Sequence, residues 1–352
     1  MDWPAALASL SRWTYDNPSV QNVPRLDRFN FQLVDTVFQF GINCFLLLET
    51  SNNPPILVVL FRGSQDIVDW MSNIDTVPKM ITGLPIALMR GIYDSLDDCL
   101  YPSNTNTFMR ICEKIGGLID SNRTTSIIVG GHSRGKALAI CFKGLLSWDE
   151  KNRDFKQKLL SKGCRVTVMT QAAPNIIAFG ENITYAAGQK KISFHEGQLQ
   201  ALINEVTYDI HMWLHEDDLL AMSVLSLTNE TEFSAALQAR RFEFIPMPCN
   251  GCSAVGCLRV SKVLSFVHGQ IASSTRRHFR ILGTVHVIRR HQESITLNGS
   301  DAETYLKYPV PTGSLICFLS RIKHAHSIEQ YCSSLTHPDR IRLGKASCCS
   351  CS

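Results

Sequence analysis

The chain has 352 residues, of which 45% are hydrophobic and 19% charged, so it can form one large domain or a domain with an insertion. A net charge of +4 is too small to predict a nucleic-acid partner. The apolar run at residues 44–48 is far shorter than a membrane span, so no transmembrane helix is predicted.

The first residues, Met1-Asp2-Trp3-Pro4, carry an acid where a secretion signal carries a base, and no long apolar core follows. The 13 cysteines are an odd number, which favours free thiols over a disulfide framework. Both features predict a cytoplasmic protein.

Two apolar segments predict neighbouring strands. Residues 38–48 are expected to form a hairpin with residues 56–61. The second run is followed by Arg62-Gly63-Ser64-Gln65-Asp66 and then by Asp69-Trp70. Residues 67–89 are apolar but interrupted by prolines and a glycine, which favours a mobile amphipathic lid over a core helix. A static loop is the alternative.

The strongest signal is the run Val-Gly-Gly-His-Ser-Arg-Gly-Lys-Ala at residues 129–137. Residues 125–129 read as a buried strand and residues 137–146 as a packed helix. Between them, Gly-x-Ser-x-Gly predicts a nucleophile elbow that exposes Ser133 and directs the backbone N–H of Arg134 at a reacting carbonyl. The alternative is a Gly-Ser turn that only joins the two elements. His132 is expected to be structural.

The Phe-Arg-Gly-Ser turn, the Asp-Trp pair and the Gly-His-Ser-x-Gly elbow together resemble the class 3 lipase family. The resemblance implies an α/β-hydrolase fold: a mostly parallel central sheet with helices on both faces, a lid segment and an insertion before the last catalytic element. It also implies that Ser64 helps to form the oxyanion hole beside the N–H of Arg134. Arg134 and Lys136 depart from the usual Leu and Gly, which predicts either a cationic site mouth that suits an anionic head group or altered substrate access.

The catalytic acid and base are sought in the second half of the chain. A strand-like run at residues 206–214 ends in His-Glu-Asp-Asp, where the family places its acid, so Asp218 is predicted and Asp217 is the alternative. His326 begins an H-x-x-x-x-Y pattern that is common around the family's catalytic histidine, and His324 is its competitor. The order Ser133, Asp218, His326 is that of an α/β-hydrolase.

The predicted domain spans residues 1–336, with an insertion at residues 223–277, a strand element at 279–288 and a flexible Cys-rich tail at 337–352. The insertion contains Cys249, Cys252 and Cys257, which favour a flexible loop over a zinc site, so no metal is predicted. The tail carries Cys348, Cys349 and Cys351 after three bases, which predicts either a lipid anchor or a disordered end.

These observations predict a serine hydrolase that cleaves carboxylic esters of lipids, either acylglycerol or phospholipid, through Ser133, His326 and Asp218 and without a cofactor. The expected partner is the lipid substrate, with peripheral membrane contact through the lid and the tail. The alternatives are a catalytically inactive lipase-like module that binds lipid or protein, and a thioesterase on the same fold.

Overall fold

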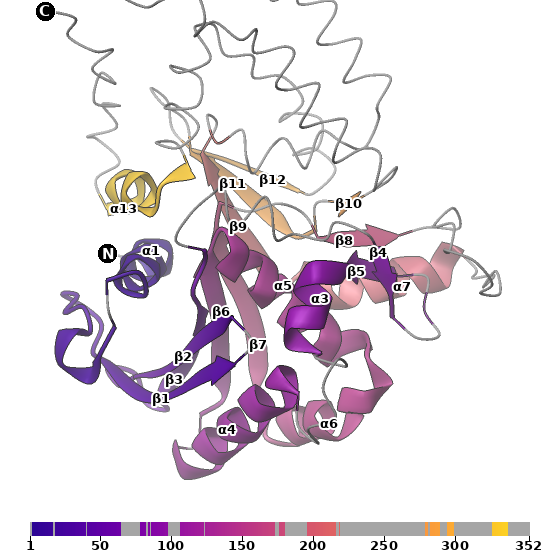
Figure 1. Ribbon diagram of the computed structural model, residues 1–352, viewed down its shortest axis with the longest axis horizontal. Coiled ribbons are helices and arrows are strands. Elements are labelled where there is room, and N and C mark those ends of the chain that lie inside the picture. The colour runs from indigo at the N-terminus through magenta and orange to yellow at the C-terminus, as the bar shows by residue number, and fades with distance from the viewer. Residues whose placement is uncertain are drawn as a thin grey trace, which may run out of the picture.

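A computed structural model describes residues 2–16, 18–39, 41–64, 78–81, 84, 86–97, 106–122, 124–172, 176–179, 196–215, 218, 279–280, 282–288, 294–298 and 326–336. Its centre is a twisted eight-stranded sheet with helices on both faces (Figure 1). The predicted α/β-hydrolase architecture of the sheet and its flanking helices is therefore confirmed.

The strand order in the central sheet is β1-β2-β3-β6-β7-β9-β11-β12. The five strands from β3 to β11 run parallel, whereas the strands at the two edges are antiparallel to their neighbours. The strands are β1 (Phe31–Gln39), β2 (Ile42–Glu49), β3 (Ile56–Phe61), β6 (Ser126–His132), β7 (Arg165–Gln171), β9 (Ile210–His215), β11 (Thr284–Ile288) and β12 (Ile295–Asn298).

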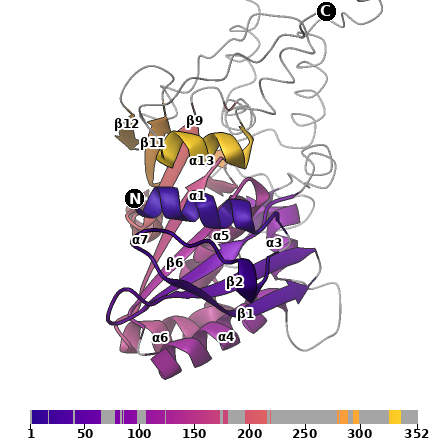
Figure 2. The ribbon, with the colours of Figure 1, turned by 90° about the vertical axis from the view of Figure 1, so that its left-hand side faces the viewer.

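The central strands are apolar on both faces because helices cover both faces. In β6, Ile127 and Val129 pack into the large core beneath α5, and Ile128 packs into a second core beneath α1. One face carries α1 (Trp3–Trp13) and α13 (Ile328–Thr336), which lie side by side (Figure 2). The larger core is covered by α3 (Arg90–Leu96), α4 (Thr107–Asn122), α5 (Arg134–Trp148), α6 (Arg153–Ser161) and α7 (Glu196–Thr207), and two short 3-10 turns lie at Val20–Asn22 and Glu150–Asn152.

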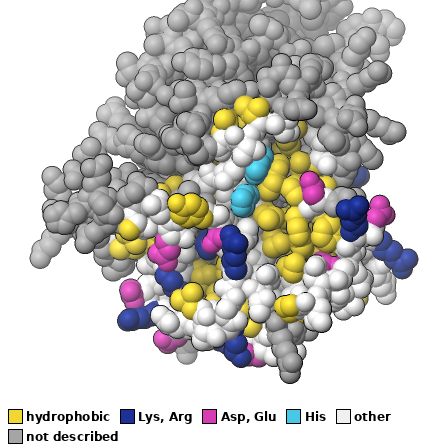
Figure 3. All heavy atoms as spheres, turned by 180° about the vertical axis from the view of Figure 1, so that it is seen from behind, with side chains coloured by type: hydrophobic (Ala, Val, Ile, Leu, Met, Phe, Trp, Pro, Cys, Tyr) yellow, Lys and Arg dark blue, Asp and Glu magenta, His cyan; other side chains and the backbone are white. Residues whose placement is uncertain are grey.

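Three aromatic rings stack across two neighbouring strands of the sheet. Trp213 of β9 is in register with His286 of β11, and their ring centroids are 4.6 Å apart with planes 14° from parallel. The His211 ring also stacks on His286, at 5.8 Å. Histidine side chains beside hydrophobic ones are visible on the rear face of the molecule (Figure 3). In-register pairing of parallel strands is what brings these rings together.

A second sheet contains part of the segment that was expected to be a lid. Its order is β10-β8-β5-β4, with β4 (Pro78–Met80), β5 (Ile86–Met89), β8 (Ile177–Phe179) and β10 (Phe279–Arg280), all antiparallel. The four residues of β5 are at most 1% exposed. The lid expectation is therefore wrong for residues 78–81 and 86–89, because both segments are held in this sheet and Ile81 and the four residues of β5 belong to the core. Residues 67–77 lie outside the described residues.

Three strand boundaries also differ from expectation. The segment 38–48 spans a turn at Gly41, which has a φ of +74°, so β2 begins only at Ile42. The run 206–214 begins inside α7, and its strand starts at Ile210. The element at 279–288 is divided between the two sheets at Gly283, which has a φ of +87° and where a Cβ would collide with the Ile210 carbonyl.

The predicted insertion at residues 223–277, with its cysteines, and the tail at 337–352 lie outside the described residues. Among the helices in the described part of the chain, none is both long enough and apolar enough to cross a bilayer.

Candidate active site

Ser133 lies at a sharp turn between β6, which ends at His132, and α5, which begins at Arg134. Its φ of 56° and ψ of −123° are unfavourable for a residue with a side chain, which is typical of a strained functional turn. The backbone of Ser133 is fixed from below, because its N–H donates to the Gln171 carbonyl of β7 at 3.2 Å. The structure therefore has the predicted strand-turn-helix geometry at this serine.

The two glycines of the motif are required by close packing. A Cβ on Gly131 would lie 2.5 Å from the backbone carbon of Gly135, and a Cβ on Gly135 would collide with the Phe61 carbonyl of β3. The elbow therefore presses directly on the end of the neighbouring strand. This contact places the segment that follows β3, which contains Ser64, beside the elbow.

The structure brings Ser133, His326 and Asp218 together from residues 193 and 108 positions apart. His326 Nε2 is 2.9 Å from Ser133 Oγ, and His326 Nδ1 is 3.0 Å from both carboxylate oxygens of Asp218. All three side chains are buried, at 5%, 3% and 0% exposure. An ionised carboxylate only accepts hydrogen bonds, so Nδ1–H donates to Asp218 and Nε2 is left to accept the serine proton.

Tyr331 of α13 holds the Asp218 carboxylate from the other side. Its hydroxyl donates to Asp218 Oδ2 at 2.9 Å and accepts the backbone N–H of His215 at 2.9 Å. Burial, reinforced by the Asp218 charge, raises the pKa of Tyr331 well above its usual value, so the hydroxyl remains a donor. The H-x-x-x-x-Y spacing contains this tyrosine, but the pattern does not predict its hydrogen bond to Asp218.

His132 connects the elbow to the backbone of His326. Its Nε2 is 2.8 Å from the His326 carbonyl oxygen, and its Nδ1 is 3.2 Å from the Tyr15 hydroxyl. Burial, reinforced by repulsion from His326, lowers the pKa of His132 to about 3, so the ring is neutral. A structural role for this side chain was expected, and the structure places it between α1 and the start of α13.

The expected oxyanion donors lie on two elements that touch. Arg134 is the first residue of α5, where backbone N–H groups have no partner within the helix and the helix dipole favours negative charge. Ser64 follows β3, and a Cβ on the preceding Gly63 would lie 2.6 Å from the His132 carbonyl oxygen. The Gly63–Ser64 turn therefore packs on the elbow itself.

The expectation of a cationic site mouth is wrong for Lys136. Lys136 is completely buried in α5, and the loss of solvent lowers its pKa to about 7 although the Asp218 charge opposes this shift. The side chain of Arg134 is also engaged, because its guanidinium donates to the Gly41 carbonyl at 3.0 Å and to Ser95 Oγ at 3.2 Å. A position three residues into a helix that faces the core turns Lys136 inward, away from the mouth.

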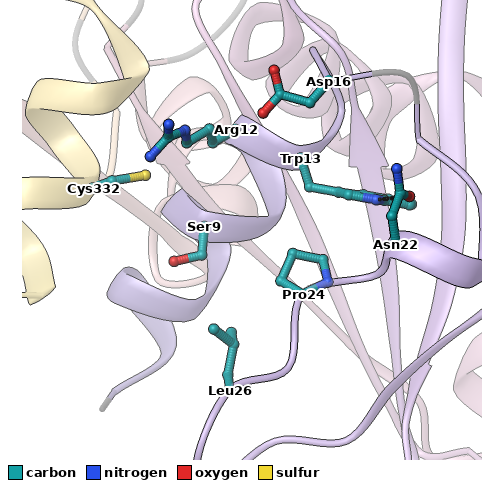
Figure 4. A pocket seen from close by; sticks show the side chains of 8 residues that line it. All are labelled: Ser9, Arg12, Trp13, Asp16, Asn22, Pro24, Leu26 and Cys332. Carbon is teal, nitrogen blue, oxygen red and sulfur yellow. Dashed lines mark hydrogen bonds between the residues drawn. The ribbon is translucent and has the colours of Figure 1, made fainter.

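Asp217 and His324, the alternatives for the acid and the base, lie outside the described residues. Within the described residues, no group of three or more His, Cys, Asp or Glu side chains is arranged to hold a metal ion. A surface groove between α1, the segment at residues 22–26 and Cys332 of α13 is lined by none of the three site residues (Figure 4).

A central parallel sheet with a serine elbow, a histidine and an aspartate at its carboxyl edge defines an α/β-hydrolase. Residues 58–223 match the family model described as Lipase (class 3). This match supports a carboxylic ester hydrolase.

Two similar solved structures reach a TM-score of 0.50 and support the fold alone. A triacylglycerol lipase with a serine protease triad is 13% identical, over 90% of each chain, with a TM-score of 0.50. A lipase from Rhizopus microsporus var. chinensis is 11% identical, over 90% of this chain and 83% of its own, with a TM-score of 0.50. A Rhizomucor miehei lipase propeptide complex, a deletion mutant, is 15% identical over 62% of this chain, which spans 58% of that one, with a TM-score of 0.41. No curated protein sequence matches the chain.

Proposed function

We propose that the protein is a serine hydrolase that cleaves the carboxylic ester of an acylglycerol. The observation that carries the proposal is the continuous hydrogen-bonded series from Ser133 Oγ through the His326 ring to the Asp218 carboxylate. A hydroxyl, an imidazole and a carboxylate in this order are the groups that acyl transfer needs. The match of residues 58–223 to the class 3 lipase model supports a lipid ester as the substrate.

The proposed reaction has two halves. Ser133 Oγ attacks the acyl carbonyl while His326 Nε2 takes the serine proton, and Asp218 stabilises the imidazolium that forms. The proton then passes to the leaving alcohol as its C–O bond breaks, which leaves an acyl group on Ser133. Water, deprotonated by His326, releases the fatty acid and restores the serine.

The oxyanion that forms in each half would be held by the backbone N–H groups of Ser64 and Arg134. Asp218 does not need to accept a proton during these steps, and the hydroxyl of Tyr331 supports its charged form. The buried position of all three groups strengthens these interactions, because water competes poorly for them.

The choice of acylglycerol over phospholipid rests on the two cations of the elbow. Lys136 is enclosed in the core, and the guanidinium of Arg134 binds Gly41 and Ser95. Neither side chain is therefore placed to bind an anionic head group, and a neutral glyceride is the substrate that this site favours. Hydrolysis of a phospholipid at the same rate as a glyceride of equal chain length would contradict this choice.

The test is labelling with a fluorophosphonate probe, followed by turnover of glycerol esters, phospholipids and thioesters of matched chain length. We expect the probe to label the wild-type protein at Ser133, and Ser133→Ala to lose both labelling and turnover while its melting temperature stays close to wild type. A folded wild-type protein that neither reacts nor turns over any ester would instead support a lipid- or protein-binding module. Faster turnover of thioesters would support a thioesterase.

A further inference from the structure

Tyr15 lies just beyond the end of α1 and touches both sides of the site. Its hydroxyl is 3.2 Å from His132 Nδ1, on the strand that carries the nucleophile. The same oxygen lies against Gly63, in the turn that contains Ser64, because a Cβ on Gly63 would collide with it. The Arg62 guanidinium, from that turn, lies 5.7 Å from the centre of the Tyr15 ring. One side chain thus contacts the turn and the elbow together.

The direction of every hydrogen bond in this series follows from its partners. A carbonyl oxygen can only accept, so His132 Nε2–H donates to His326 O. The neutral His132 ring then has an unprotonated Nδ1, which accepts the Tyr15 O–H. The Tyr15 oxygen in turn packs against Gly63, where a Cβ would collide with it. Two hydrogen bonds and this packing contact therefore connect the turn beside Ser64 to the backbone of His326.

The side chain of Tyr15 is closely packed in this arrangement. A Cβ on Gly63 would collide with the Tyr15 hydroxyl and would lie 2.6 Å from the His132 carbonyl oxygen. On its other side, the Tyr15 ring packs against the cluster of Ala172, Ile288, Ile328 and Tyr331, which joins the sheet to α13. Another side of α1 faces the groove with Arg12 and Cys332 (Figure 4), whereas Tyr15 contacts the Gly63–Ser64 turn and His132.

We propose that Tyr15 and His132 form a positioning relay, which holds the Gly63–Ser64 turn and His326 in register around Ser133. The inference rests on the proposed serine hydrolase function. Neither residue touches substrate, and neither transfers a proton. Through the relay, the N-terminal helix α1 fixes the distance between the oxyanion donors and the base, two groups that must act on one carbonyl at the same moment.

The first experiment compares Tyr15→Phe with Thr14→Val, using a soluble short-chain ester. Thr14 is a matched control, because it is fully buried at the same helix end. Within the described part of the chain, its hydroxyl donates only to Ser11 O, at 2.7 Å. Tyr15→Phe should lower kcat by about 10-fold with KM within about 2-fold of wild type, as expected when one buried hydrogen bond that positions the site is lost. Thr14→Val should lower the melting temperature by as much as Tyr15→Phe does, while its kcat stays at the wild-type value.

The second experiment changes the other member of the relay. Gln can donate an amide N–H to the His326 carbonyl, whereas Leu cannot, so His132→Gln should retain more of kcat than His132→Leu. In the double variant Tyr15→Phe/His132→Leu, the loss should be smaller than the product of the two single losses, because both changes break one series. The rate of fluorophosphonate labelling should follow kcat in every variant.

The results distinguish a failure of the relay from a failure of the proposed serine hydrolase function. A Tyr15→Phe protein with wild-type kcat, or losses that multiply in the double variant, would overturn the relay and leave the serine hydrolase intact. If Tyr15→Phe does not fold, equal kcat values for His132→Gln and His132→Leu would overturn it in the same way. A wild-type protein that turns over no ester would overturn the proposed function, and the relay with it.

Discussion

At the scale of single residues, the site depends on hydrogen bonds that a motif does not contain. The elbow motif identifies Ser133, and the resemblance to class 3 lipases, supported by chain order, selects Asp218 and His326. The structure brings these three residues together. Tyr15 belongs to no pattern, because a tyrosine beyond a short helix has no partner within reach along the chain. Only tertiary packing places it at the elbow.

Tyr331→Phe should lower kcat by about 10-fold or more and leave KM nearly unchanged. The hydroxyl donates to Asp218 at 2.9 Å, and a hydrogen bond to a charged group contributes about 1.5–3 kcal/mol. Steady-state kinetics on a soluble ester measures this loss. Tyr93→Phe, which removes another buried tyrosine hydroxyl from α3, is the control and should retain kcat. Equal kcat in the two variants would mean that Tyr331 serves only the fold.

Lys136 should make the protein more stable as the pH rises from about 7 to 10.5, the pKa values in the folded and unfolded states. In this window the unfolded chain still binds the lysine proton and the folded chain does not, so the free energy of unfolding increases with pH. The whole increase is at most about 5 kcal/mol. Lys136→Met should flatten it in urea titrations at several pH values, whereas Lys151→Met, at 63% exposure, should not. Parallel curves for wild type and Lys136→Met would contradict this origin.

At the scale of elements, steric contacts decide where local propensity is ambiguous. The run 279–288 reads as one strand, but the left-handed backbone at Gly283 divides it between two sheets. The segment 86–89 reads as part of a lid because prolines and a glycine surround it, yet its side chains complete the core beneath α5. Neither result could be predicted from sequence, because both depend on which strands become neighbours.

Gly135→Ala tests the contact between the elbow and β3. Alanine favours a helix, so propensity alone predicts a more stable α5, but the new Cβ would meet the Phe61 carbonyl. Relieving this contact should cost about 1–3 kcal/mol of stability, and a displaced elbow should lower kcat about 100-fold. In α4, a Cβ on Gly117 has nothing within 4 Å, so Gly117→Ala should gain about 0.5–1 kcal/mol at unchanged kcat. Urea unfolding and ester turnover measure both, and a stabilised, active Gly135→Ala protein would contradict the packing argument.

At the scale of the whole molecule, the parallel sheet explains how distant residues meet. Ser64, Ser133 and Asp218 each follow the carboxyl end of a different parallel strand, namely β3, β6 and β9, so all three lie at one edge of the sheet. His326 precedes α13 and reaches this edge because α13 packs against α1 (Figure 2). Alternating apolar strands and helices predict such an edge. The packing of α1 on α13 could not be predicted, because the sequence of neither helix contains a pattern that indicates the other as its partner.

The segment at residues 340–352 lies outside the described residues and contains several cysteines beside basic residues. It combines Cys348, Cys349 and Cys351 with three bases, Arg340, Arg342 and Lys345, and we propose that acylation of these cysteines anchors the protein to a membrane. One acyl chain gives only marginal binding and two give stable anchoring, so replacing one cysteine with serine should weaken membrane association and replacing all three should release the protein. Turnover of a soluble ester should be unchanged, because the segment supplies none of the site residues. Cell fractionation measures the release, and a triple variant that still sediments with membranes would show that another surface binds them.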